Sequence, residues 1–86
     1  MSKINVTKVG NLVQFNEPTG STFIVTTESF AGVRVYPYFD KKTAEAKMAI
    51  KLFFDMNGQD PIVYNGYDYE DEAFADANKV IRMMGA

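Results

Sequence analysis

Residues 40–58 form the longest stretch of the chain with the composition of a helix. Asp40 is a favourable N-cap, because its side chain can accept from the free N–H groups of a first turn. Neither Gly nor Pro follows until Gly58, which suits a helix end. On a helix the apolar side chains share one broad face, opposite Lys47 and Lys51. The sequence therefore predicts a helix over 40–58 that covers a sheet made by the preceding residues.

Four strand-like runs precede this segment, at 3–9, 12–17, 22–28 and 33–39. Gly10-Asn11 suits a two-residue type II′ hairpin loop, which pairs Val6 with Phe15. Pro18 and Gly20 suit a three-residue loop, which pairs Phe15 with Phe23. An odd loop after residue 28 would place Val33 and Val35 beside Phe23 and Val25. These pairings predict a four-stranded antiparallel meander, with Pro37 at an edge or near a strand end.

A second helix is predicted over 69–84, where apolar residues recur at helical spacing: Ala73, Phe74, Ala77, Val80, Ile81 and Met84. Acidic residues at its start and basic residues near its end complement the helix dipole. Asn65-Gly66 is a turn signal, so residues 62–68 are predicted to add a short strand or a small hairpin. The predicted fold class is α+β, in the order β-β-β-β-α-α, within one domain spanning 1–86.

Composition narrows the chemistry open to the chain. It contains no Cys and no His, which excludes disulfides, thiolate metal sites, cysteine nucleophiles and the commonest general base. We therefore predict no enzyme activity, no metal and no cofactor. The first residues lack the apolar core of a signal peptide, and no apolar run reaches the length of a membrane span. The predicted location is the cytoplasm, with no membrane partner.

Seven acidic residues and no basic ones occur within 55–76, interleaved with tyrosines. Tyrosine supplies contact area with a polar tip, so this segment predicts a surface that binds another protein. The residues assigned to it are Tyr64, Tyr67, Tyr69, Glu70, Asp71 and Glu72. The predicted function is a small non-catalytic protein-interaction module, an inhibitor or adaptor, with mimicry of nucleic-acid phosphates as one mode. The competing interpretation is dipole compensation and solubility.

An alternative function uses the sheet face that carries Arg34, Tyr36 and Tyr38. Tyrosines could stack on the bases of a single-stranded nucleic acid, while Arg34, Lys3 and Lys8 meet phosphates. The net charge of −2 and pI near 4.9 argue against this alternative. Nucleic acid therefore ranks as a partner below another protein and below a second copy of the chain, which could cover the same face as a homodimer.

Lys41 and Lys42 would lie in the first turn of the helix predicted over 40–58, where cations oppose the helix dipole. One interpretation is an anion contact at that helix start. The other is that Lys41 pairs with Glu45 one turn later, while Asp40 offsets the rest.

Overall fold

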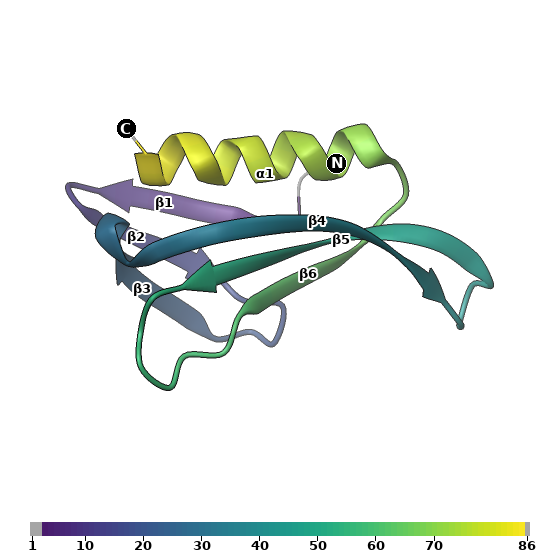
Figure 1. Ribbon diagram of the computed structural model, residues 1–86, viewed down its shortest axis with the longest axis horizontal. Helices are drawn as coiled ribbons and strands as arrows, with labels where there is room; N and C mark the ends of the chain where they lie inside the picture. The colour runs from purple at the N-terminus through teal and green to yellow at the C-terminus, as the bar shows by residue number, and fades with distance from the viewer. Residues whose placement is uncertain (1–2, 86) are drawn as a thin grey trace.

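The protein folds into two three-stranded antiparallel sheets and one C-terminal α-helix, in a computed structural model that describes residues 3–85 (Figure 1). The first sheet consists of β1 (Asn5–Val9), β2 (Leu12–Asn16) and β3 (Thr22–Thr26). A 3₁₀ turn, η1 (Thr27–Ser29), leads into the second sheet, made of β4 (Phe30–Asp40), β5 (Glu45–Phe54) and β6 (Ile62–Tyr67). The helix α1 (Glu70–Gly85) follows directly.

The first sheet confirms the predicted hairpins and their register. Val6 pairs with Phe15 across the first turn, where Gly10 has φ +61°. Phe15 pairs with Phe23 across the second turn, where Glu17 N–H donates to the Ser21 carbonyl at 2.8 Å and Gly20 has φ +96°. Both glycines occupy left-handed conformations that other residues adopt at a cost, so local turn chemistry set the register.

The predicted four-stranded meander is wrong, because β4 does not continue the first sheet. Val33 and Val35 pair with Leu52 and Ile50 of β5 instead of with β3. The turn η1 redirects the chain after Thr26, and β4 becomes an edge strand of a separate sheet. Pro37 lies on this edge strand, as its missing N–H requires.

The helix predicted over 40–58 is also wrong, since most of this segment forms β5. Lysines four residues apart suit one face of a helix, but they also fall on one face of a strand. The apolar residues fit the strand pattern equally well, with Ile50, Leu52 and Phe54 all buried on the other face. Ten cross-strand pairs with β4 then override the helical propensity of the segment.

Strand β6 confirms the predicted extra strand, although Asn65-Gly66 does not form a hairpin turn. The pairing of β5 with β6 shifts between Met48 and Ile50, opposite Asn65 and Gly66, which form a β-bulge. Gly66 has φ +87°, the left-handed conformation that such bulges favour in glycine.

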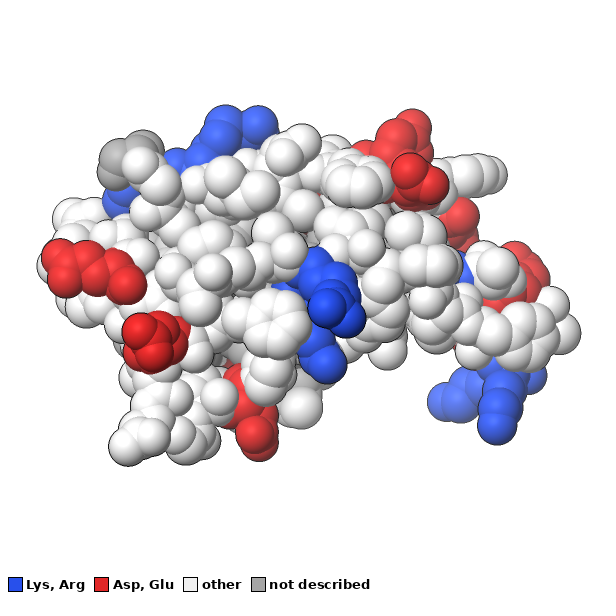
Figure 2. Space-filling model, viewed as in Figure 1, with Lys and Arg blue, Asp and Glu red and all other residues white. Residues whose placement is uncertain are grey.

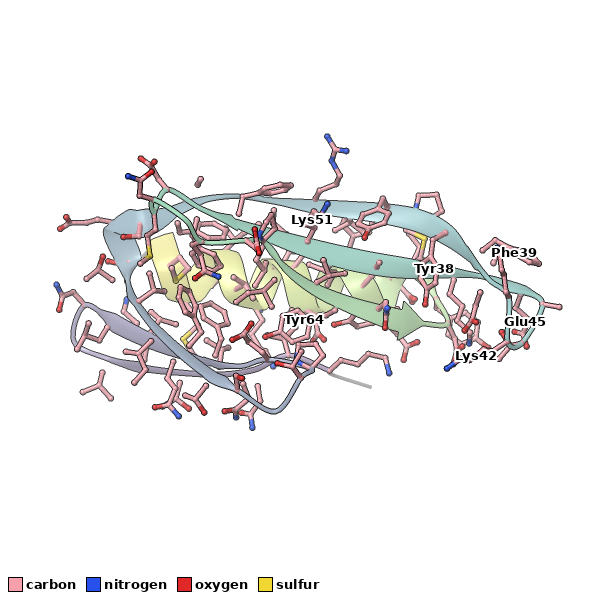
Figure 3. All side chains as sticks on the ribbon, turned by 90° about the horizontal axis from the view of Figure 1, so that it is seen from below. Tyr38, Phe39, Lys42, Glu45, Lys51 and Tyr64 are labelled. Atoms are coloured by element: carbon pink, nitrogen blue, oxygen red, sulfur yellow. The ribbon has the colours of Figure 1, made fainter. Side chains whose placement is uncertain are left out.

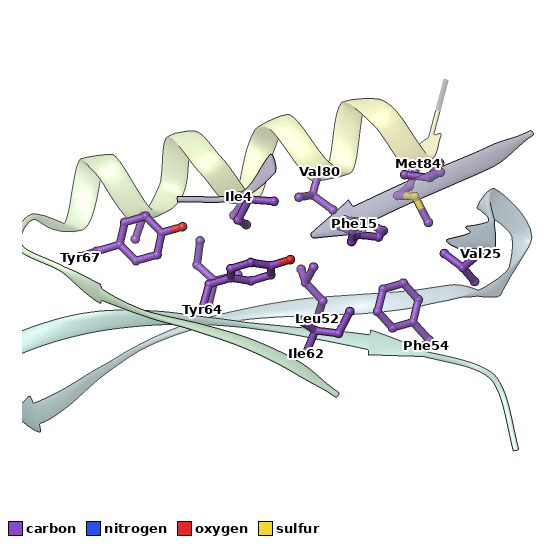
Figure 4. Close-up of a cluster of buried hydrophobic side chains, with 14 residues drawn as sticks. Ile4, Phe15, Val25, Leu52, Phe54, Ile62, Tyr64, Tyr67, Val80 and Met84 are labelled. Carbon is purple, nitrogen blue, oxygen red and sulfur yellow. The ribbon is translucent and has the colours of Figure 1, made fainter. Parts of the chain in front are cut away.

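The hydrophobic core lies between the two sheets and α1 (Figures 1 and 4). Phe54 contacts three rings edge to face, those of Phe15, Phe23 and Phe30, with centroid distances of 5.1 to 6.1 Å. The predicted helix over 69–84 is confirmed to within one residue at each end. The buried side of this helix differs from the predicted apolar stripe, because Phe74 and Ile81 are exposed and Asp76 is buried.

The Asp76 side chain connects α1 to the backbone of Lys3 and Ile4 by hydrogen bonds. Its Oδ2 accepts hydrogen bonds from the backbone N–H groups of Lys3 at 2.8 Å and Ile4 at 3.3 Å, and from the Tyr67 hydroxyl at 2.6 Å. Lys79 Nζ donates to the Ile4 carbonyl at 2.7 Å. These bonds satisfy a carboxylate that would otherwise be costly to bury.

The helix α1 is too short and too polar to span a membrane, and it is the only α-helix within residues 3–85.

Candidate functional site

One face of the second sheet has no layer of residues 3–85 over it. The opposite face contacts the first sheet and α1, whereas the uncovered face looks outward (Figures 1 and 3). We call it the outer face of the second sheet. Cross-strand pairing assigns to it a set of β4, β5 and β6 residues: Gly32, Arg34, Tyr36, Tyr38, Asp40, Glu45, Lys47, Ala49, Lys51, Phe53 and Val63. The alternation of β4 thus places the three predicted residues Arg34, Tyr36 and Tyr38 together on an open surface.

Two cations on this face oppose one another directly. Arg34 is the cross-strand partner of Lys51, and like charges in this arrangement destabilise a sheet. Among residues 3–85, no acidic side chain forms an ion pair with either of them. Lys51 Nζ lies 5.9 Å from the centroid of the Phe53 ring, a cation–π contact that offsets part of the repulsion. Figure 2 shows one group of basic side chains near the centre of the view and others at its upper left and lower right, with acidic groups around the centre and along the edges.

The charge of the chain is divided between its segments. Residues 30–54, which span β4 and β5, hold five basic and two acidic residues, a net charge of +3. The rest of the chain holds four basic and nine acidic residues, a net charge of −5. The overall charge of −2 is therefore the sum of a basic hairpin and an acidic remainder, and the hairpin itself has the charge that nucleic acid attracts.

A third cation, Lys47, is already paired. Its Nζ lies 2.6 Å from Asp68 Oδ1, between β5 and the residue that follows β6. This hydrogen bond raises the pKa of Lys47 and lowers the pKa of Asp68. Lys47 is consequently less available to an external anion than Arg34 or Lys51.

Three aromatic side chains share the face with the cations. Tyr36, Tyr38 and Phe53 are each half-buried, so their rings are held in place yet reach solvent. Ala49, the cross-strand partner of Tyr36, is buried, so the larger half-buried rings supply the aromatic surface of this face. Rings beside unpaired cations can stack on planar groups and neutralise anions.

The acidic, tyrosine-rich surface keeps only part of its predicted membership. The side chains of Tyr64 and Tyr67 are buried in the core, so they do not reach a partner (Figure 4). Burial and the nearby Glu17 carboxylate raise the pKa of Tyr64 to about 12, and its hydroxyl donates to the Asn16 carbonyl at 3.0 Å. Burial, together with the hydrogen bond to Asp76, raises the pKa of Tyr67.

The remaining acidic residues lie at the start of α1. Tyr69, Glu70 and Asp71 are exposed, and Glu72 is half-buried. Phe74, which was assigned to the core from its spacing, is exposed and lines a shallow hollow with Tyr69, Glu70, Asp71, Ala75 and Asn78.

Lys41 and Lys42 do not lie at a helix start, because no helix begins there. They occupy the exposed tip of the β4–β5 hairpin, where Ala44 has φ +56° (Figure 3). Asp40 Oδ1 accepts the Lys42 backbone N–H at 2.9 Å and so stabilises the turn. The anion contact predicted from a helix dipole therefore has no structural basis, whereas the two cations remain exposed.

Sequence reasoning missed Lys51 and Phe53 as members of the outer face because it assigned them to a helix. Their alternation with Ile50 and Leu52 was the available signal. Within the described part of the chain, no group of three or more Asp or Glu side chains could hold a metal ion. Comparison of the chain with protein families, with curated proteins and with solved structures gives no match.

Proposed function

We propose that the protein binds single-stranded nucleic acid on the outer face of the second sheet. The observation that carries this proposal is the pairing of Arg34 with Lys51, at the centre of an uncovered sheet and without an acidic partner in residues 3–85. An arrangement that costs stability persists where a ligand compensates for it. A chain of phosphates would neutralise both cations at once.

The aromatic side chains favour single-stranded over double-stranded nucleic acid as the ligand. Tyr36, Tyr38 and Phe53 present rings on the same face as the cations, and unpaired bases stack on such rings irrespective of sequence. In a duplex the bases are already stacked on one another and unavailable to a flat sheet. The proposed mode is therefore phosphates at Arg34 and Lys51, with neighbouring bases on the rings.

Fluorescence anisotropy with a labelled oligonucleotide of about 12 nucleotides tests this function, since that length lies within the usual range for a single small domain. The single strand should bind more tightly than the same sequence as a duplex, and its binding should weaken as salt is raised. Absence of binding at low salt, or equal binding of the two forms, would contradict the proposal.

A second candidate function is binding of a protein through the start of α1. The hollow beside Tyr69 and Phe74 favours it, because two exposed aromatic side chains flank acidic ones there. Pull-down with the variant Tyr69→Ala/Phe74→Ala tests this candidate against Ile81→Ala, which removes an exposed apolar side chain elsewhere on the helix. A partner retained by Ile81→Ala and lost by the double variant would support it, whereas equal retention by all forms would reject it.

A further inference from the structure

We propose that a hollow at the end of the β4–β5 hairpin is a subsite for one nucleobase, which rests on the proposed function and extends it to base recognition. The hollow is lined by Tyr38, Phe39, Asp40, Lys41 and Lys42 of the hairpin and by Asn65 and Gly66 of β6. It is continuous with the outer face of the second sheet, because Tyr38 belongs to both.

The hollow exists because the strands of the second sheet have unequal lengths. Pairing between β5 and β6 reaches only Met48, while β4 and β5 continue to Asp40 and Glu45. The hairpin therefore overhangs the end of β6, and Figure 3 shows Tyr38 and Lys42 on this overhanging part. The bulge at Asn65 and Gly66 lies opposite and supplies the other wall.

The lining has the chemistry of a nucleotide site. The Tyr38 ring can stack on a base, and Lys41 and Lys42 outnumber Asp40, whose Oδ1 is occupied by the Lys42 N–H. The Asn65 side chain is exposed and bonds to no other group within residues 3–85. An amide offers a donor and an acceptor side by side, which match the N6 and N7 positions of adenine. The bound base is accordingly an adenine on Tyr38, with its phosphate at Lys42.

Anisotropy with two labelled strands of equal length tests the subsite, one of thymines only and one in which adenines alternate with thymines. The adenine-containing strand should bind about fivefold more tightly, and Asn65→Ala should abolish this difference by weakening the adenine-containing strand more than the thymine strand. The control Asn78→Ala removes an exposed amide from the helix and should keep the preference.

A second variant tests the phosphate contact. Lys42→Ala should weaken both strands equally, whereas Arg82→Ala, which removes the same charge from the far end of α1, should not. Equal affinity of the normal protein for both strands, or a preference that survives Asn65→Ala, would overturn the subsite and leave the proposed function standing. No binding to either strand would overturn both.

Discussion

The outer faces of the two sheets differ in charge although the sheets are built alike. Each sheet has three antiparallel strands and one face in the core. The outer face of the first sheet carries no charged residue: Asn5, Thr7, Val9, Leu12, Gln14, Asn16, Thr22, Ile24 and Thr26. The outer face of the second sheet carries Arg34, Lys47 and Lys51 among aromatic rings, and its two acidic residues, Asp40 and Glu45, pair with each other at the hairpin end.

This difference shows that an exposed sheet face of this protein does not need charged residues. The first sheet shows that the fold tolerates a solvent-facing sheet without charges, even with Val9 at 73% and Ile24 at 57% exposure. Arg34 and Lys51 are therefore not required to keep an open face in water. Their direct opposition costs stability, and under the proposed function an anionic ligand compensates for that cost.

The largest effect is expected on the stability of the fold, through the buried hydrogen bonds of Asp76. Asp76→Ala should lower the free energy of unfolding by about 3 kcal/mol, because it leaves buried N–H and O–H donors without an acceptor. Urea titration measures the loss, with exposed Asp60→Ala as a control that should stay within about 0.5 kcal/mol. A small effect of Asp76→Ala would show that the first strand is held mainly by packing.

A second expected effect distinguishes the aromatic side chains of the second sheet from the aliphatic ones of the first. Tyr36→Leu should weaken oligonucleotide binding about fivefold or more, because a base loses its stacking partner. Ile24→Ala removes an exposed apolar side chain from the first sheet and should leave binding unchanged. Anisotropy, with melting temperatures to confirm folding, measures both. Equal losses would remove the distinction between the faces.

The change in the salt dependence of binding should report the contact of Arg34 with a phosphate. When the logarithm of the affinity is plotted against the logarithm of the salt concentration, the line for Arg34→Gln should be shallower. Its slope should be smaller in magnitude by about 0.7, the value for one phosphate contact on a single strand. Gln14→Glu, which makes the same unit change in charge on the first sheet, should leave the slope unaltered. A smaller affinity with the original slope would mean that Arg34 does not contact phosphate.

The smallest effect has the opposite sign. Arg34→Gln should raise the free energy of unfolding slightly, by about 0.2 to 1 kcal/mol, since it removes a like-charge pair from the sheet. Thermal unfolding at low salt measures the change, and added salt should reduce it. A loss of stability would show that the guanidinium contributes to packing and would weaken the inference from the like-charge pair.

Local signals predicted the parts of the fold that depend on neighbours in the sequence. Glycines at 10 and 20 set the register of the first sheet, and spacing with favourable charges defined α1. The prediction for residues 45–54 was wrong because the spacing of Lys47 and Lys51 fits both a helix and a strand. Only pairing with β4, which is distant in the sequence, decides between the two.

The same distinction applies to the candidate site. Alternation within β4 placed Arg34, Tyr36 and Tyr38 on one face, which the structure shows. Lys51 and Phe53 were missed together with their strand. Tyr64 and Tyr67 were taken as surface residues because alternation with acidic neighbours resembles a solvated segment, yet both rings complete the core.

One measurement tests the central claim most directly, namely the affinity of two double variants for the same single-stranded oligonucleotide. Arg34→Gln/Lys51→Gln and Thr7→Glu/Thr22→Glu change the net charge equally, on the second and the first sheet respectively, and the two new glutamates lie on strands that are not neighbours. We expect the first pair to lose about tenfold in affinity for each cation at about 50 mM salt, and the second pair to change little. Equal losses would contradict the claim, because binding would then follow overall charge and not the outer face of the second sheet.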